Sequence, residues 1–280
     1  MPVKKSIQNP IDFVYCLCGE SEYCKITPEL EFSILSLRRN VPWLRYIWII
    51  VPDNYNTGNL KGSDIKHVHE STIVPKKYLP THNSNVVESW IWRLKGLSDL
   101  FVYMNDDMYI GRPVSPSDFF TGPQGTTPIL RLEPGPTRHP RLEELTGQSA
   151  NIPYVRMWAG AITKYNLDFT RIQHQALPQR VSILTRLYKQ YKKAVDEASN
   201  NKHRSGEFDF NLVRFASPMA VMSGDSYLQV TDTSIDFFME SDDYANIKKV
   251  PRIKPKFFCI NNNGPDNKIV YKMLANYFKA

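Results

Sequence analysis

The sequence predicts an α/β protein in which an open, mostly parallel sheet is flanked by helices, with a helical insertion in its second half. Two observations carry this prediction. Short apolar runs rich in β-formers alternate with helical patterns over roughly the first hundred residues, which is the order of parallel α/β folds. The chain has 280 residues, of which 42% are hydrophobic, so it can bury a core of ordinary size.

The first strand and the first helix have clear local signals. Residues 11–18 form an apolar run of strand length. Thr27 is a good helix cap, and Pro28 suits the first helical position because the N–H that proline lacks is not needed there. This helix would bury an apolar stripe formed by Leu30, Ile34 and Leu37.

Three more strands and a second helix continue the alternation. Residues 45–51, 65–68 and 100–104 are short apolar runs. Before the last of them a helix is predicted to begin at Asn85, with Glu88 three residues later at the spacing of a capping box. Its buried stripe would consist of Val87, Trp90, Ile91 and Leu94. In an open α/β sheet the ligands bind beyond the carboxyl ends of the strands.

The second half of the chain is less regular. Glycine and proline crowd the stretch after Phe120, which predicts a loop or lid of about twenty residues. Residues 179–198 have the pattern of a long amphipathic helix with a basic face, and residues 208–222 that of a second, mostly apolar helix. A last short strand is predicted over residues 257–260.

Charge narrows the class of partner. Thirty-five Lys and Arg against 28 Asp and Glu leave a net charge of +7, which favours an anionic partner. The basic residues gather in residues 180–193 and 248–256 without a nucleic-acid-binding motif, so no nucleic acid is expected.

No apolar run approaches the roughly 20 residues of a membrane-spanning helix, so any membrane association would be peripheral. Residues 1–9 are polar and lack a secretory signal, which predicts a cytoplasmic location.

Three of the four cysteines lie close together in the sequence: Cys16, Cys18 and Cys24. Their Cys-x-Cys spacing differs from the Cys-x-x-Cys pairs of common zinc sites. We therefore expect reduced, partly buried thiols, with a metal or redox role as the alternative.

Two adjacent carboxylates follow the apolar run at residues 101–104. Asp106 and Asp107, preceded by Asn105, would repel each other unless a cation lay between them, and Mg²⁺ or Mn²⁺ prefers such oxygen ligands. The alternative is an ordinary surface turn, because Asp and Asn favour turns after strands.

The segment before the second helix is unusually polar. Residues 81–85 supply five polar side chains, whereas a helix cap needs one or two, so the surplus predicts a ligand near the start of that helix. Glu88 is then either the capping partner of Asn85 or a member of the site.

Two basic side chains are further candidates. His174 precedes the long helix and is either the acceptor of a proton from an attacking hydroxyl or an ordinary histidine. Arg204 lies in a polar loop, where it either clamps phosphate oxygens or is merely hydrated.

These residues lie in segments that resemble the conserved blocks of the Stealth family. That family includes capsule and exopolysaccharide phosphotransferases and the catalytic subunit of animal N-acetylglucosamine-1-phosphotransferase. Its second and longest block is similar to residues 29–53, 79–92 and 97–120. The first, third and fourth blocks resemble residues 11–15, 174–224 and 257–263, so the likeness follows the family order along nearly the whole chain.

The resemblance implies a fold and a domain organisation. The sheet would be of the glycosyltransferase-A-like type, within a single catalytic domain over residues 1–280. Residues 1–120 would form the half that binds a nucleotide sugar. Residues 121–280 would supply a lid, the helical insertion and the C-terminal completion of the domain.

The resemblance also implies a reaction. Stealth enzymes move a hexose-1-phosphate from a nucleotide diphosphate sugar, typically UDP-linked, to a glycan hydroxyl and release a nucleoside monophosphate. Motif by motif, it implies that the catalytic residues are Glu88, Asp107, His174 and Arg204, and that Asp106 and Asp107 hold Mg²⁺ or Mn²⁺. The substrate contacts that it implies are Asn83, Ser84, Asn85, Arg39, Arg112, Asn261 and Asn263.

Two departures from the family pattern keep alternatives open. Residues 16–20 lack the Asp of the usual first block, which leaves either altered nucleotide binding or compensation by Glu20, and Asn262 stands where the fourth block carries Asp. An amide in place of a carboxylate would weaken a divalent cation site. The alternatives are a metal-dependent glycosyltransferase that releases a nucleoside diphosphate and a catalytically silent module that binds a glycan or nucleotide. The four retained catalytic residues favour an active sugar-phosphate transferase.

Overall fold

The structure is a computed structural model, and most of the chain is described in it. The described residues are 9–17, 27–55, 60–134, 169–172, 175–204, 210–230, 237–241, 249–261 and 267–279.

A central sheet of five described strands organises the molecule. The strands are β1 (Ile11–Cys16), β2 (Ile47–Val51), β3 (Ile65–His69), β4 (Leu100–Met104) and β9 (Leu177–Arg180), in the order β3-β2-β1-β4-β9. The first four are parallel and β9 runs antiparallel to β4. The predicted open, mostly parallel sheet is confirmed. Strands β2 and β4 are buried along their whole length, and strands buried on both faces are typically continuous apolar runs.

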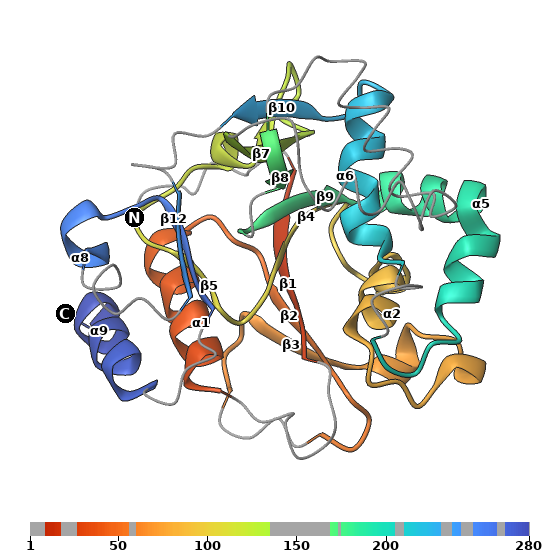
Figure 1. Ribbon diagram of the computed structural model, residues 1–280, viewed down its shortest axis with the longest axis horizontal. Coiled ribbons are helices and arrows are strands. Elements are labelled where there is room, and N and C mark those ends of the chain that lie inside the picture. Colours follow the sequence, from red (N-terminus) through yellow and green to blue (C-terminus); the bar gives the residue numbers. More distant parts are fainter. Residues whose placement is uncertain are drawn as a thin grey trace.

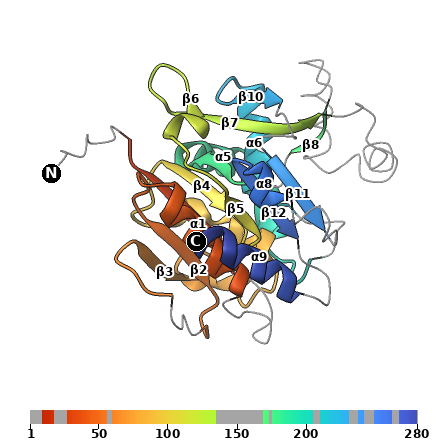
Figure 2. The same ribbon diagram turned by 90° about the vertical axis from the view of Figure 1, so that its left-hand side faces the viewer.

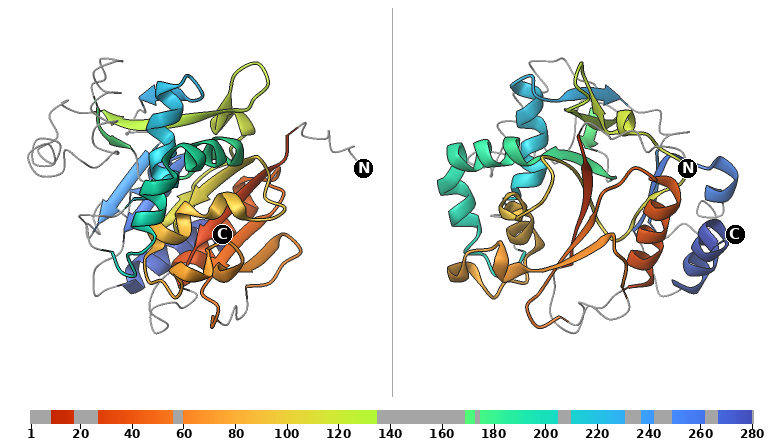
Figure 3. Two further views of the ribbon diagram at one scale, coloured as in Figure 1. Left: turned by 90° about the vertical axis from the view of Figure 1, so that its right-hand side faces the viewer. Right: turned by 180° about the vertical axis from the view of Figure 1, so that it is seen from behind.

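Helices cover both faces of this sheet (Figure 1). The α1 helix (Pro28–Asn40) and α9 (Asn267–Lys279) lie on one side, while α2 (Ser84–Ser89), α5 (Val181–Ala198) and α6 (Leu212–Met222) lie on the other. The same division is visible from behind in Figure 3. Successive side chains of a strand point to opposite faces of the sheet. Phe13 therefore packs in the core beneath α1, and the next residue, Val14, packs in the core beneath α2 and α5. The α5 and α6 helices are the predicted helical insertion.

The α1 helix begins where its sequence predicts. Thr27 is the N-cap, and its hydroxyl oxygen accepts a hydrogen bond from the backbone N–H of Leu30 at 3.2 Å. Pro28 occupies the first helical position. Leu30, Ile34 and Leu37 are all buried, as expected from their spacing.

The α2 helix begins one residue earlier than predicted. Its N-cap is Asn83, whose side-chain oxygen accepts from the backbone N–H of Asn85 at 3.1 Å. The Asn83 amide nitrogen also donates to the carbonyls of Asn201 and His203, at 3.3 and 3.4 Å, so distant contacts select this residue as the cap. Asn85 therefore lies within the helix, and the interpretation of Glu88 as its capping partner is wrong. A 3₁₀ turn, η3 (Ile91–Arg93), follows.

The stretch after Phe120 differs from the predicted loop. It contains β6 (Phe120–Thr121) and the eight-residue β7 (Thr127–Pro134), which form a second sheet with β8 (Phe169–Ile172) and β10 (Tyr227–Val230) (Figure 2). The β7 strand is stabilised by pairing with β10, which lies about a hundred residues later in the chain and is invisible to a local pattern. The rest of the predicted lid lies outside the described residues. The long helix also starts at Val181 rather than at residue 179, because β9 includes the two preceding residues.

A third sheet completes the described fold. It has the order β11-β12-β5, formed by β11 (Phe237–Ser241), β12 (Phe257–Asn261) and β5 (Met108–Ile110). The predicted strand over residues 257–260 is confirmed as β12. The remaining short elements are η1 (Glu70–Thr72), η2 (Lys76–Tyr78), η4 (Pro116–Asp118) and α8 (Val250–Ile253). Within the described ranges, no helix has the length and apolar character needed to span a membrane. The division into two functional halves stays a prediction.

Candidate functional site

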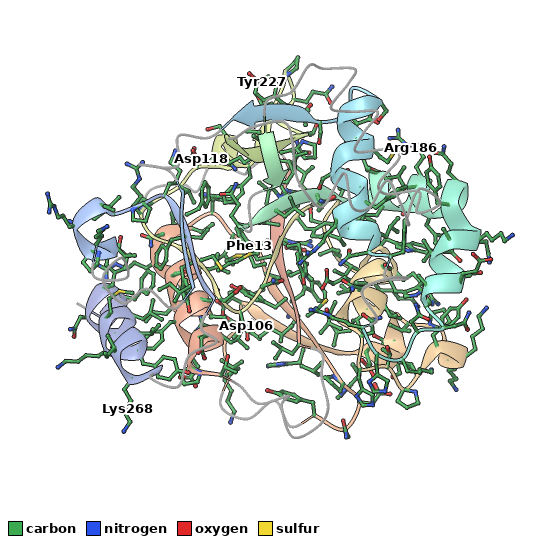
Figure 4. The ribbon with its side chains drawn as sticks, viewed as in Figure 1. Phe13, Asp106, Asp118, Arg186, Tyr227 and Lys268 are labelled. Carbon is green, nitrogen blue, oxygen red and sulfur yellow. The ribbon has the colours of Figure 1, made fainter. Side chains whose placement is uncertain are left out.

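The paired carboxylates lie in the turn between β4 and β5, at the carboxyl edge of the central sheet. Figure 4 shows Asp106 near the middle of the molecule. The Thr27 hydroxyl donates a hydrogen bond to Asp106 Oδ2 at 3.3 Å, so the cap of α1 also holds this side chain. Burial, and after it the charge of Asp107, raises the pKa of Asp106. A cation bound here would stabilise the ionised Asp106 carboxylate against both its burial and the repulsion from Asp107.

Asp107 contacts the third sheet. Its carbonyl oxygen accepts from the backbone N–H of Ile260 at 3.0 Å. Burial, and then the charge of Asp107, raises the pKa of the Cys259 thiol well above its usual value, which makes this thiol a poor nucleophile. Cys259 and the half-buried Cys16 are both free thiols, as expected. Cys18 and Cys24 lie outside the described residues.

Glu88 lies in α2, which covers the opposite face of the sheet and packs against α6. Its side chain is buried, and Asn211 donates from its amide nitrogen to Glu88 Oε2 and, at 3.1 Å, to the side-chain oxygen of Asn85. The Tyr103 hydroxyl, near the end of β4, hydrogen bonds to Glu88. Burial and then the charge of Glu88 raise the pKa of Tyr103 well above its usual value. Two partners thus fix the orientation of the Glu88 carboxylate.

Asn211 and Tyr103 were missed by the sequence analysis. Asn211 has a local signal, since it is a lone amide beside the apolar run that forms α6. Tyr103 has none, because it is one of several large apolar residues in a buried strand.

The polar residues around the start of α2 contact a loop that is distant in the sequence, at residues 202–204. Arg204 donates to the Ser84 hydroxyl, and the backbone N–H of His82 donates to the carbonyl of Lys202 at 2.8 Å. The His82 and His203 rings stack with centroids 5.1 Å apart. The structure therefore brings Arg204 to the Asn83–Ser84–Asn85 segment, as the sequence prediction requires. These contacts with residues 202–204 also explain in part why residues 81–85 carry more polar side chains than a helix cap needs.

Two other predicted substrate contacts lie elsewhere. Arg39 donates to the backbone carbonyls of Tyr277 and Phe278, at 3.3 and 2.9 Å, so its guanidinium satisfies carbonyls at the end of α9. Arg112 lies near the same tyrosine, where the charges of both arginines act to lower the pKa of Tyr277, although its burial raises that pKa overall. The structure does not bring Arg39 to the Glu88 or Asp106 groups.

Part of the predicted site lies outside the described residues. This holds for His174, for Asn263 and for the side chain of Asn261, whose backbone ends β12. Among the residues that are described, no three His, Cys, Asp or Glu side chains are grouped closely enough to hold a metal ion. A metal held by Asp106 and Asp107 would thus draw further ligands from substrate, water or residues outside that set.

A cavity of about 580 Å³ lies beyond the carboxyl ends of β2 and β3. This volume is within the range of small-molecule sites. Its polar lining includes Asp53 after β2, Glu70 and Lys76 after β3, and Thr81 and His82 before α2. It therefore adjoins the segment that holds Arg204. The strand ends signalled this site in the sequence, but the buried Glu70 was missed.

Glu70 makes the stability of the protein depend on pH. Burial, and then the nearby Asp53, raises the pKa of Glu70 from 4.5 to about 7, and its Oε2 has no hydrogen-bond partner among the described residues. Because the folded-state pKa is the higher one, the unfolding free energy falls as pH rises through this range. We expect Glu70→Gln to reduce the loss of stability between about pH 5 and pH 8 by roughly 2 kcal/mol.

Urea unfolding of both proteins at the two pH values measures this difference. The matched control is Glu197→Gln, which removes an exposed carboxylate from α5 and should leave the pH dependence of the wild type. If the unfolding free energies of the wild type and of Glu70→Gln depended equally on pH, ionisation of Glu70 would not destabilise the folded protein.

One segment of the chain, residues 24–127, matches a known protein family. Residues 24–127 match the family model described as Stealth protein CR2, conserved region 2. Over these residues the chain is similar to the Stealth family. The matched segment, called the Stealth region below, begins three residues before the α1 cap Thr27, ends at the start of β7 and includes Glu88, Asp106 and Asp107. The predicted resemblance to the Stealth family is confirmed.

Curated relatives extend the likeness beyond the Stealth region. The capsular polysaccharide phosphotransferase fcs1 of Haemophilus influenzae is 28% identical over 276 residues, which cover 89% of this chain and 70% of that protein. The exopolysaccharide phosphotransferase SCO6023 of Streptomyces coelicolor is 29% identical over 184 residues, or 63% of this chain and 30% of that protein. The prediction that the chain is an enzyme of the transferase class is confirmed.

Among solved structures, the galactosyltransferase LgtC in complex with donor and acceptor sugar analogs aligns over 96% of this chain and 95% of its own. The TM-score is 0.46 and the sequence identity is 10%.

Proposed function

We propose that this protein transfers a hexose-1-phosphate from a nucleotide diphosphate sugar, such as a UDP-sugar, to a hydroxyl of a glycan. The product would be a phosphodiester and the leaving group a nucleoside monophosphate. The observation that carries the proposal is the Stealth region itself, whose acidic residues lie at the carboxyl edge of the sheet. The relatives named as capsular and exopolysaccharide phosphotransferases support this proposal and a role in polysaccharide biosynthesis.

The donor set at Asp106 and Asp107 fits a hard divalent cation. Two neighbouring carboxylates, one of them with a pKa raised by burial and by the other, are more stable when a cation neutralises them. We propose that they hold Mg²⁺ or Mn²⁺, which when bound would neutralise charge on the donor diphosphate.

The remaining residues have distinct proposed roles. Arg204, held through Ser84 beside the start of α2, would bind the oxygens of the transferring phosphoryl group and stabilise its charge. His174 would accept the proton of the attacking glycan hydroxyl. Glu88, oriented by Asn211 and Tyr103, would position the sugar of the donor.

The cavity beyond β2 and β3 is the proposed place of the donor nucleoside. It lies at the carboxyl edge where open α/β sheets bind their ligands, and its 580 Å³ suit a group of this size. Asp53 and Thr81 would offer hydrogen-bond partners to the base and ribose.

The identity of the released nucleotide tests the proposal. The purified protein is incubated with Mn²⁺, UDP- or GDP-sugars and oligosaccharide acceptors, and the nucleotides are separated by chromatography. We expect a nucleoside monophosphate that appears only when donor and acceptor are both present and that is lost in His174→Ala. An exposed-site variant, Lys268→Gln, serves as the control.

Two results would contradict the proposal. Release of a nucleoside diphosphate would show glycosyl transfer with cleavage at the anomeric carbon. Donor binding measured by calorimetry without turnover on any acceptor would favour a silent binding module.

A further inference from the structure

A second, smaller cavity of about 160 Å³ lies between the second sheet and the start of β12. Its lining includes Ser117, Asp118, Thr121, Arg131, Tyr227 and Lys256. Figure 4 shows Asp118 and Tyr227 along the upper part of the molecule and Asp106 below them, nearer the centre. The cavity is thus separate from the acidic pair and from the larger cavity beyond β2 and β3.

The charges around this cavity favour an anion. Lys256 Nζ lies 2.7 Å from Asp118 Oδ1, and Arg131 donates to the backbone carbonyl of Asp118. The other carboxylate oxygen, Oδ2, accepts from the backbone N–H of Ser115 at 2.8 Å. One carboxylate with both oxygens engaged faces two cations, so the lining has a net positive charge. The hydrogen bonds from Lys256 and Ser115 lower the pKa of Asp118 even though burial opposes them.

The Arg131 guanidinium has a fixed position. The side chain is 5% exposed, and its guanidinium carbon lies 4.8 Å from the centroid of the Phe257 ring, over its face. A guanidinium held in this way keeps its planar set of N–H donors in one orientation, which suits the paired oxygens of a phosphate ester. Little side-chain entropy would then be lost on binding.

An exposed aromatic ring borders the same cavity. Tyr227, the first residue of β10, is 56% exposed, the highest value for a large hydrophobic side chain among the described residues. A ring in that position offers an apolar face and a hydroxyl, the combination that suits an amphipathic partner such as a sugar. Thr121 and Ser117 add hydroxyl groups to the lining.

We propose that this cavity binds the growing glycan at one of its phosphodiester groups. Arg131 and Lys256 would contact the phosphate, and the Tyr227 ring would pack on the adjoining sugar. This inference rests on the proposed function, because sugar-phosphate transfer makes a glycan whose links carry negative charge. The cavity would bind product already made rather than the reacting groups.

The fold connects the cavity to the acidic turn through one strand. Phe257 lines the cavity at the start of β12, and Ile260 on the same strand donates to the carbonyl of Asp107. Three residues of a strand span about 10 Å. An oligosaccharide held at the cavity could therefore keep its end near the proposed reaction site, which would raise the effective concentration of the acceptor.

Binding titrations test the proposal without requiring turnover. The probes are a synthetic tetrasaccharide joined by phosphodiesters, a neutral tetrasaccharide of the same hexose, and inorganic phosphate. Each is titrated by calorimetry into the wild type, Tyr227→Ala, Lys256→Gln and the control Lys268→Gln, which removes a charge from an exposed part of α9 at the opposite edge of the molecule. Tyr227→Trp keeps an aromatic ring and should keep the affinity.

We expect the phosphodiester tetrasaccharide to bind at least about tenfold more tightly than either other probe, and about tenfold more weakly in Tyr227→Ala and in Lys256→Gln. Equal binding of the neutral tetrasaccharide would overturn the anionic class of ligand. Equal binding of inorganic phosphate would overturn a glycan site, and unchanged affinity in both variants would overturn the location. Release of a nucleoside diphosphate in the turnover assay would instead count against the proposed function.

Discussion

Replacing Asp12 with Ala is expected to lower the free energy of unfolding by about 3 kcal/mol, because it leaves several hydrogen-bond donors without their partner, two of them buried. The Asp12 side chain is fully buried at the start of β1. Its carboxylate accepts from Arg45 Nε at 2.8 Å, from Trp48 Nε1 at 2.9 Å and from the backbone N–H of Ser98 at 2.9 Å. The substitution leaves these donors unpaired near the amino ends of three strands. Urea unfolding followed by circular dichroism measures the loss.

Asp64→Ala is the matched control for Asp12→Ala. Arg38 binds Asp64 with two nitrogens, at 2.8 and 2.7 Å, so the chemistry of the pair is similar. Both side chains are partly exposed, however, and such a pair is worth less than about 1 kcal/mol. If Asp12→Ala costs no more than Asp64→Ala, burial adds nothing to the Asp12 contacts.

The central sheet could be predicted because its signals are local. Strands such as β2 and β4 are buried on both sides, so each is a run of apolar residues in the sequence. The α1 helix has a cap and a proline at adjacent positions, Thr27 and Pro28, which need no distant partner to act. Where the determinants lie within a few residues of each other, the sequence pattern was sufficient.

The sequence predictions were wrong where contacts between residues far apart in the chain determine the local structure. Residues 81–85 are five consecutive polar residues around the start of α2, and any of several could cap it. The carbonyls of Asn201 and His203 accept hydrogen bonds from Asn83, which is therefore the cap. In the same way, β7 contains prolines and follows a glycine-rich turn, yet it is a strand because β10 pairs with it. Neither partner can be identified from the residues around α2 or β7 themselves.

The candidate site likewise contains residues that local signals predict and residues whose contacts depend on distant parts of the chain. Asp106 and Asp107 were predictable because they directly follow a buried strand, and the carboxyl end of a strand is a known place for ligands. The pairing of Glu88 with Asn211 was not predictable, since the two residues lie 123 positions apart in the sequence. Arg39 was expected at the substrate, but the end of α9 provides it with backbone carbonyls.

Replacing Asp107 with Asn is expected to lower kcat by about a thousandfold, the upper range for removing one group that stabilises transition-state charge. Under the proposed function, the amide would lower the charge at a site that needs two carboxylates to hold a divalent cation. Folding should not suffer, because the substitution removes the repulsion that helps to raise the pKa of Asp106. Release of nucleoside monophosphate at saturating donor measures the loss.

Unfolding temperatures with and without Mn²⁺ separate loss of the cation from loss of the fold. A cation that binds only the folded protein raises its stability in proportion to the logarithm of its concentration over Kd. The wild type should gain stability from Mn²⁺, whereas Asp107→Asn should gain little and should be no less stable than the wild type without metal. Asp196→Asn, which alters an i,i+4 surface pair with Lys192 on α5, is the matched control and should behave as the wild type. If Asp107→Asn keeps both its turnover and its stabilisation by Mn²⁺, the acidic pair is an ordinary turn, and the charge of the donor diphosphate must be neutralised by cationic side chains such as Arg204.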